Sequence, residues 1–243
     1  MAVTRLFCPI NLAHRAQANL PGGAAHHAIR VLRLKRGDEV RLFNGEGGEY
    51  EASIHRVEKD SVTVDIGRHH DLERESKLRV CLAQGITTGD KMDYTLQKAV
   101  ELGVARIQPL DTNRAVVRLN QDRAEKRLQH WQNVVVAACE QCGRNTVPRV
   151  AAILPFEEWV AGTDPSTVRL MFSPYAEQRL SDCAAPAGEV NMVIGPEGGL
   201  NQEEITFAQA KGFKSVRMGP RVLRTETAPL AALAAMQVLW GDL

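Results

Sequence analysis

The sequence lacks the features that would place it in a membrane or in an oxidising compartment. Its longest apolar run, Ala228–Trp240, is too short to span a bilayer. The first residues carry Arg5 and no long apolar stretch, so we expect no signal peptide. Five cysteines are an odd number in a chain of 243 residues, which favours a reducing compartment over a disulfide framework. We therefore expect a soluble, cytoplasmic protein without a membrane partner.

The chain also has no large excess of charge of either sign, and it contains no internal repeat or low-complexity tract. Its 30 Lys and Arg residues nearly balance its 29 Asp and Glu residues, which gives a formal net charge of +1. This balance neither indicates nor excludes a nucleic acid partner, because a local basic patch can bind phosphate on a neutral protein. With 44% hydrophobic residues, the chain can form one large or two modest domains with a buried core.

Several common catalytic motifs are missing as well. Cys139 and Cys142 lie in a helical pattern without a second cysteine pair or a histidine at ligand spacing, so we expect structural thiols and no metal. The histidine pairs at 26–27 and 69–70 lack the HExxH pattern and are expected at the solvated surface. No GxSxG elbow occurs, and no Gly-Lys-Ser/Thr follows a glycine loop. These absences argue against serine, metal-dependent and nucleoside triphosphate hydrolysis.

The first 70 residues have the pattern of a small β-domain. Short β-like runs lie at 3–7, 39–43, 49–57 and 61–66. The glycines at 45, 47 and 48 predict a hairpin turn. A dinucleotide loop would require a third glycine where Tyr50 stands, and a helix where a strand is expected. The polar, charged stretch 69–77 is the best candidate for a linker.

After residue 78, strand-like and helix-like segments alternate, which predicts a parallel α/β sheet. Strands are predicted at 78–84, 106–110, 168–173, 190–194 and 215–218. Helices are predicted from an N-cap at Asp90 to Gly103, over 124–142, from Asn201 to near Gly212, and over 228–239. Asn201 and Glu204 have the spacing of a capping box.

Two loops rich in glycine and proline are the most informative segments of the chain. Gly195–Gly199 and Met218–Ala228 each follow a predicted strand and lead into a predicted helix. Open α/β sheets bind ligands beyond the carboxyl ends of their strands, and glycine lets the backbone approach a ligand closely. Either loop alone also fits an ordinary βα turn, whereas the pair favours a pocket built mostly from main chain. Arg217, Arg221 and Arg224 border this pocket, where arginine can bind phosphate or carboxylate or stabilise an oxyanion.

A second cationic group lies in the β-rich part of the chain, partly offset by Asp38 and Glu39. Its five members fall within twelve residues: Arg30, Arg33, Lys35, Arg36 and Arg41. Both a surface that contacts a phosphate backbone and an ordinary solvated face fit this pattern.

Together these motifs resemble those of the SPOUT-type RNA methyltransferases, specifically the RsmE family of 16S ribosomal RNA uracil-N3 methyltransferases. The signature loops are Gly195–Gly199 and Met218–Ala228. Further segments stand in the order that the family shows, namely Gln97–Val104, Pro109 with Arg114, and Glu140–Arg144 followed by Pro148. The segments around Phe43 and Glu49 resemble the family's PUA-like RNA-binding domain, so the resemblance covers essentially the whole chain.

The resemblance implies an α/β protein with a small PUA-like β-barrel domain over 1–72 and a SPOUT methyltransferase domain over 73–243. The second domain would hold a parallel sheet and a deep trefoil knot, which no pattern argument would propose. The resemblance implies S-adenosylmethionine as cofactor, bound among loops at 171–174, 194–199 and 218–224. Its expected contacts are Met171, Phe172, Ile194, Gly195, Pro196, Gly198, Gly199, Met218, Gly219, Leu223, Arg224 and Thr225. The expected partners are 16S ribosomal RNA or the small ribosomal subunit and a second copy of the chain, with 228–239 in the dimer interface.

Methylation of uracil N3 removes a proton and places negative charge on the ring oxygens. We expect Arg224 first, and Arg144 second, to stabilise that charge. Glu197 is a candidate proton acceptor, with a loop or dimer contact as the alternative. N3 lies on the Watson–Crick edge, so the base must be unpaired or extruded to react. The residues expected to contact RNA are Arg30, Arg33, Lys35, Arg36, Arg114 and Arg221.

Three alternative functions remain open at this point. A related knotted enzyme would methylate a ribose 2′-oxygen. A class I, Rossmann-type methyltransferase would place its glycine loop after the first strand of the domain, where 83–89 is a poor match. A non-catalytic RNA-binding assembly factor would retain the pocket only as structure.

Overall fold

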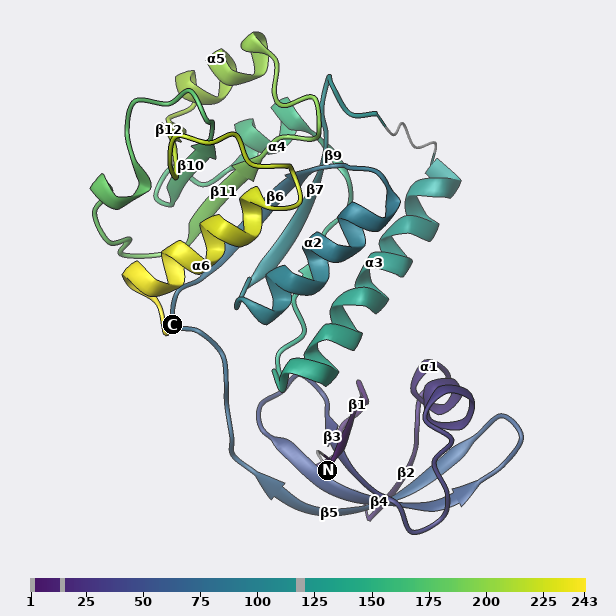
Figure 1. Cartoon of the computed structure of the whole chain (residues 1–243). Coiled ribbons are helices and arrows are strands. Elements are labelled where there is room, and N and C mark those ends of the chain that lie inside the picture. Colours follow the sequence, from purple (N-terminus) through teal and green to yellow (C-terminus); the bar gives the residue numbers. More distant parts are fainter. Residues whose placement is uncertain (1–2, 14–15, 117–120) are drawn as a thin grey trace. The chain divides into compact units, whose positions relative to one another are not determined.

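A computed structural model describes residues 3–13, 16–116 and 121–243 of the chain (Figure 1). The chain forms two compact units. The first comprises Met1–Glu75 together with Cys139–Val147, and the second comprises Ser76–Ala138 together with Pro148–Leu243. The last turn of helix α3 (Gln121–Cys142) therefore belongs to the first unit, and the rest of this helix belongs to the second.

The first unit contains a five-stranded mixed sheet. Its strands are β1 (Thr4–Phe7), β2 (Gln17–Asn19), β3 (Glu39–Phe43), β4 (Glu49–Val57) and β5 (Val62–His70). They follow the order β1-β3-β4-β5-β2, in which β1 pairs parallel with β3 and the remaining pairs are antiparallel. A short helix, α1 (Gly22–His26), continues directly into a π-helical turn, η1 (His27–Val31).

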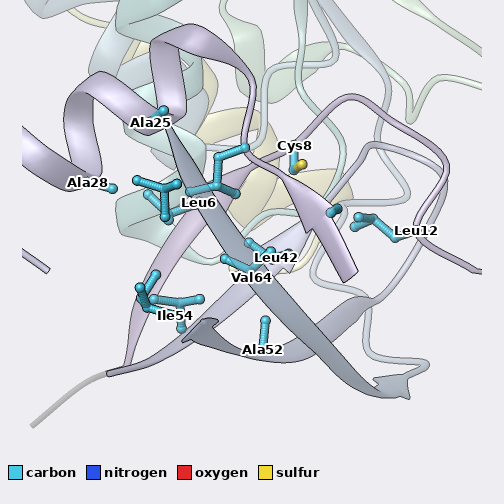
Figure 2. Packing of buried hydrophobic residues seen from close by; sticks show 13 residues of the cluster. Leu6, Cys8, Leu12, Ala25, Ala28, Leu42, Ala52, Ile54 and Val64 are labelled. Carbon is cyan, nitrogen blue, oxygen red and sulfur yellow. The ribbon is translucent and has the colours of Figure 1, made fainter. Parts of the chain in front are cut away.

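Side chains from the strands and from the helical segment form one core in this unit. Leu6, Leu42 and Ile54 from the sheet are buried with Ala25 and Ala28 from α1 and η1 (Figure 2). Within the described residues, β1 and β2 lie at the two edges of the strand order. The predicted barrel is thus an open five-stranded sheet whose core the helical segment helps to complete.

The hairpin predicted at the glycines is present between β3 and β4, and Gly45, Gly47 and Gly48 all have positive φ. The predicted linker begins later than expected, because β5 extends to His70. His69 and His70 pair with Tyr50 and Glu49 of β4. The His69 ring lies 4.6 Å from the Tyr50 ring, so this histidine contributes to strand packing in addition to facing solvent.

The second unit is built on a parallel sheet, as predicted. Its strands are β6 (Val80–Gly85), β7 (Arg106–Asp111), β8 (Arg149–Val150), β9 (Leu154–Pro155), β10 (Val168–Phe172), β11 (Val190–Ile194) and β12 (Lys214–Val216). The order is β12-β10-β11-β6-β7-β8, with β9 also paired to β7, and every pair is parallel. All residues of β6 and β11 are buried, which is typical of strands covered on both faces.

Helices cover both faces of this sheet. They are α2 (Gly89–Glu101), α3 (Gln121–Cys142), α4 (Phe156–Gly162), α5 (Gln202–Ala210) and α6 (Ala228–Trp240), with a 3₁₀ turn, η2 (Leu180–Asp182). α2 packs against α6 in front of the strands (Figure 1). α4 and α5 share a separate buried cluster with the sheet, to which they contribute Phe156 and Ala208. The unit is therefore a three-layer α/β domain. Among the described residues, no helix is long and apolar enough to span a membrane.

The first residues of α5 and α2 show whether the predicted N-caps are present. Asn201 caps α5 as predicted: its side chain accepts a hydrogen bond from the Glu204 N–H at 2.7 Å, while the Glu204 carboxylate accepts one from the Asn201 N–H at 2.8 Å. The N-cap predicted at Asp90 is wrong. Thr88, whose backbone is extended, occupies that position, and Asp90 lies in the first turn of α2.

Candidate functional site

The three loops singled out in the sequence leave neighbouring strands at one edge of the parallel sheet. β10 lies between β12 and β11 and pairs parallel with both. Parallel strands have their carboxyl ends at the same edge of a sheet, so the segments after Phe172, Ile194 and Val216 start side by side. The sheet order thus brings together three loops that are separated in sequence.

Two hollows meet at the loop after β12. A small cavity of about 60 Å³ is lined by Phe172, Ser173, Pro174, Val216, Arg217, Met218, Gly219, Arg221, Leu223 and Ala228. A larger hollow of about 450 Å³ is lined by Arg179, Leu180, Ser181, Arg217, Met218, Gly219, Pro220, Ala235 and Leu239. A Cβ added at Gly219 would meet no heavy atom within 4 Å, so this glycine faces open space. Four predicted cofactor contacts, Phe172, Met218, Gly219 and Leu223, therefore line a real cavity.

The other predicted cofactor contacts are placed differently. Met171 and Ile194 are buried core residues, so only their main chain can reach a ligand. Thr225 is buried, and its hydroxyl donates a 2.8 Å hydrogen bond to the Gly195 carbonyl. Gln84, at the carboxyl end of β6, places its side-chain nitrogen 3.3 Å from the Thr225 hydroxyl and 3.4 Å from the same carbonyl. Thr225 thus ties the two glycine loops together.

Sequence reasoning did not single out Gln84. The available signal was a polar side chain within a strand that is otherwise apolar, at the point where the strand meets its loop. A buried amide in such a place needs hydrogen-bond partners, and here the partners are the loops themselves.

Two glycines are required by the packing of the Gly195–Gly199 loop. A Cβ at Gly85 would lie 2.7 Å from the backbone nitrogen and Cδ of Pro196. A Cβ at Gly198 would lie 3.0 Å from the Arg114 Cβ, and the Arg114 guanidinium donates a 3.1 Å hydrogen bond to the Gly198 carbonyl. At Gly198 this close contact is with protein, where the sequence suggested close contact with a ligand. Arg114, expected to bind RNA, is partly engaged in holding the loop.

The Glu197 carboxylate anchors the same loop to α2. It accepts hydrogen bonds from the Thr88 backbone N–H at 3.2 Å and hydroxyl at 3.0 Å, and it pairs with the Lys91 ammonium at 3.3 Å. Burial alone would raise the pKa of Glu197, but these hydrogen bonds and that of its own N–H lower the pKa below its ordinary value. A carboxylate stabilised in this way is a weaker base, which favours the loop contact over the proton acceptor.

The two candidate catalytic arginines have contrasting surroundings. Arg224 is exposed, and its guanidinium has no hydrogen bond or ion pair with any residue that the structure describes. Its backbone carbonyl accepts hydrogen bonds from the N–H groups of Thr227 and Ala228, both at 2.9 Å. Arg144 belongs to the first unit, is 5% exposed, and binds the Glu75 carboxylate through two nitrogens at 3.0 and 2.5 Å.

The predicted RNA-contact residues of the first unit are exposed, and three of them border two different hollows. Lys35 and Arg36 border a hollow of about 560 Å³ that is also lined by Leu34, His55, Arg56 and Val57. Arg30 borders a different hollow of about 280 Å³, and Arg33 is an exposed residue with a φ of 53°. Arg41 is half-buried and paired with Glu49 and Glu51, so carboxylates already balance its charge.

His55 and Arg56 join Lys35 and Arg36 because a turn is tied to β4. The Gly37 N–H donates to the Ile54 carbonyl at 2.8 Å, and the Ile54 N–H donates to the Asp38 carbonyl at 2.9 Å. A register shift in the β4–β5 pairing follows at Ile54 and Arg56, and such a bulge re-aims side chains. His55 and Arg56 were not predicted for the cationic group because they are distant from it in the chain.

The structure describes no group of three or more His, Cys, Asp or Glu residues that could hold a metal ion within 3–13, 16–116 and 121–243. Cys139 and Cys142 are free thiols of the first unit. Burial raises the pKa of Cys139 to about 12, so this thiol stays protonated at neutral pH.

Comparison with known proteins matches the whole chain. An RNA methyltransferase domain model matches residues 74–237, and an RNA methyltransferase PUA domain model matches residues 20–67. Ribosomal RNA small subunit methyltransferase E of Buchnera aphidicola subsp. Schizaphis graminum is 32% identical over 244 residues, covering 99% of this chain and 98% of that protein. The Bacillus subtilis protein of the same name is 30% identical and covers 92% of each chain.

Two solved structures are similar over the full length of the chain. A ribosomal RNA small subunit methyltransferase E from Neisseria gonorrhoeae, bound to S-adenosylmethionine, is 41% identical with a TM-score of 0.92. A putative methyltransferase from Legionella pneumophila, in complex with the same cofactor, is 37% identical with a TM-score of 0.96. Each covers 100% of both chains.

Proposed function

This chain belongs to the RNA methyltransferase family, with the ribosomal RNA small subunit methyltransferases E as full-length relatives, and from that premise we propose that it methylates N3 of a specific uridine in 16S ribosomal RNA with S-adenosylmethionine. The observation that carries the proposal is that three loops leave the adjacent strands β12, β10 and β11 at the same edge of the sheet, where the loops after β10 and β12 line one cavity. Similar structures at 37% and 41% identity hold S-adenosylmethionine.

The residues present fit this cofactor. It combines a neutral adenosyl group with a zwitterionic methionine, so it needs backbone N–H and C=O groups and few charged side chains. The loops at 171–174, 194–199 and 218–224 supply main chain at the sheet edge, and Gly219 leaves open space beside them. When bound, the cofactor supplies a methyl group on a sulfonium centre. The chain's own contribution is to hold and orient it, which is the main requirement of an in-line transfer.

We assign charge stabilisation on the uracil ring to Arg224. Loss of the N3 proton leaves negative charge on the ring oxygens, and a guanidinium can donate hydrogen bonds to that charge. Arg224 follows the cavity-lining residue Leu223, and its side chain is not engaged by other described residues. Arg144 is held by Glu75, so we assign it a structural role in the first unit.

RNA contact is assigned to both parts of the chain. We propose that 1–72 is the RNA-binding domain, with Lys35, Arg36 and Arg56 around one hollow, and that 73–243 is the methyltransferase domain. The PUA match over 20–67 supports the first assignment, and the methyltransferase match over 74–237 supports the second. Arg221, which lines the small cavity and is exposed, would contact RNA near the reacting base.

Three further features of the proposal concern the oligomeric state, the knot and the cellular location. We propose a homodimer through α6, because Val238 and Leu239 on this helix are 68% and 46% exposed. We propose a deep trefoil knot, because the two glycine loops resemble the signature loops of the SPOUT-type methyltransferases. We propose a cytoplasmic location, where small ribosomal subunits are found.

The test compares Arg224→Ala with Arg79→Ala, an exposed arginine that precedes β6 at the opposite edge of the sheet. We expect Arg224→Ala to lower the methylation rate by roughly 10²–10³-fold with unchanged binding of S-adenosylmethionine by calorimetry, and Arg79→Ala to behave as wild type. A normal rate for Arg224→Ala would exclude the catalytic assignment. Mass spectrometry of the RNA nucleosides tests the reaction itself: a 2′-O-methyl product or no product would overturn uracil-N3 methylation.

A further inference from the structure

Tyr175 exposes its ring to an unusual degree. It is 87% exposed, more than any other large hydrophobic side chain in the part of the chain that the structure describes. Aromatic rings carry a large apolar surface and are mostly buried in folded proteins. A ring left in solvent by its own chain is therefore available to bind something else.

The backbone that carries Tyr175 is held in a fixed turn. The Ala176 N–H donates to the Ser173 carbonyl at 3.3 Å, and the Tyr175 N–H donates to the Ser173 hydroxyl at 3.3 Å. Pro174 at the second position of the turn fixes its own φ. The Ser173 N–H donates to the Val216 carbonyl at 3.0 Å, which ties the turn to the end of β12. The ring thus projects from a preorganised turn, so binding would not require the backbone to become ordered.

The same turn forms part of the candidate cofactor cavity. Ser173 and Pro174 line it, together with Arg217 and Arg221. Tyr175 directly follows Ser173 and Pro174, so its ring starts from a turn that shares a cavity with cationic side chains. Proteins bind unpaired nucleic acid with aromatic rings and cations together, because bases stack on the rings and phosphates meet the cations. The position next to the cavity is where an extruded base and its neighbours would lie.

We propose that Tyr175 stacks on an unpaired base of the substrate RNA at the mouth of the cofactor cavity. The inference rests on the proposed RNA methyltransferase function and adds a base-stacking residue to it. Stacking does not read base identity, so Tyr175 would strengthen binding of the target strand while other contacts select the uridine. The cationic residues Arg217 and Arg221 would hold the backbone beside the stacked base.

The test uses Tyr175→Ala, Tyr175→Phe and Tyr175→Trp with Tyr94→Ala as the matched control. Tyr94 is also an exposed tyrosine, at 49%, and lies on α2. We expect Tyr175→Ala to raise KM for RNA roughly tenfold with unchanged affinity for S-adenosylmethionine. The Phe and Trp variants should keep wild-type KM because they retain a ring, and Tyr94→Ala should match wild type.

Three outcomes would overturn the inference. One is an unchanged KM for Tyr175→Ala, and another is an equal loss in the Phe and Trp variants. The third is a shift of Tyr175→Ala to a smaller species in sedimentation, which would assign the ring to contact with a second copy of the chain. Direct RNA-binding measurements separate this inference from the proposed function. Ring-dependent RNA binding without methylation by the wild-type protein would retain the stacking role and reject the enzyme.

Discussion

Replacing Thr225 by valine tests whether the two glycine loops depend on one hydrogen bond. Valine has nearly the same shape as threonine, so the packing stays intact while the hydroxyl is lost. The change removes the 2.8 Å bond to the Gly195 carbonyl and the 3.3 Å contact with the Gln84 amide. From the described residues, the Gly195 carbonyl then retains only the 3.4 Å contact from Gln84.

The size of the effect follows from the burial of the site. A typical intramolecular hydrogen bond contributes about 1 kcal/mol, and a buried polar group left without a good partner costs about 1–3 kcal/mol. Thr225 is 8% exposed and Gln84 is fully buried, so water replaces the lost bond poorly. We expect about 2 kcal/mol of destabilisation, which corresponds to a fall in Tm of roughly 4–8 °C for a unit of this size. Because the bond joins two cofactor loops, affinity for S-adenosylmethionine should fall roughly tenfold.

Thermal unfolding and calorimetric titration with S-adenosylmethionine measure the two effects. Thr227→Val is the matched control, because Thr227 is exposed and its side chain makes no capping hydrogen bond at the start of α6. Thr225→Ser keeps the hydroxyl and should keep most of the affinity. Wild-type affinity and Tm in Thr225→Val would refute the idea that this bond holds the loops together.

Four further predictions address the loops and the core. Gly85→Ala should destabilise the protein by about 1–3 kcal/mol in urea unfolding, because its Cβ would lie 2.7 Å from Pro196. Gly219→Ala should unfold like wild type but bind S-adenosylmethionine more weakly, because its Cβ enters open space at the cavity. The reverse pattern would contradict both assignments. The lowered pKa of Glu197 stabilises the folded protein above the ordinary pKa of 4.5, and this stability is lost as pH falls through the folded pKa. Glu197→Gln should therefore reduce the fall in unfolding free energy at acid pH. An unchanged fall would count against the role of Glu197 in holding the loop. Burial raises the pKa of Cys81 to about 12, so iodoacetamide at pH 8 should label this thiol only after denaturation, and rapid labelling of the native protein would contradict its burial.

The sequence was sufficient to predict the parts of the fold in which a local pattern and the tertiary structure agree. The run at 190–194 is mostly apolar, which is the pattern of an interior parallel strand. It is observed as β11, in which every residue is buried. Asn201 and Glu204 satisfy each other locally, so the start of α5 follows from two residues alone. The glycine loops were placed correctly because they follow such strands.

Other elements depend on partners that are distant in the chain. β8 and β9 have two residues each, and β2 has three, too few to show any periodicity. The segment at 22–31 was missed as a helix, because its alanines become core residues only when the sheet packs against them. The cationic group shows the same limit: Arg41 lies near Lys35 in sequence, yet Glu49 and Glu51 neutralise it, while Arg56 enters the hollow from another strand.

The structure favours Arg224 over Arg144 as the residue that stabilises charge on the substrate, whereas the sequence offered both as candidates. Arg224 precedes the buried Thr225, and its carbonyl accepts two hydrogen bonds at the start of α6, so its backbone is fixed on both sides. Its guanidinium nevertheless remains in solvent. A fixed backbone with an unengaged charged group lowers the ordering cost of stabilising charge on a substrate, as catalysis by orientation requires. Arg144 has the opposite character, because Glu75 already neutralises its charge and burial restricts its movement. Transferring Arg144 to an anion would leave the Glu75 carboxylate without this partner, which makes Arg224 the better candidate on energetic grounds.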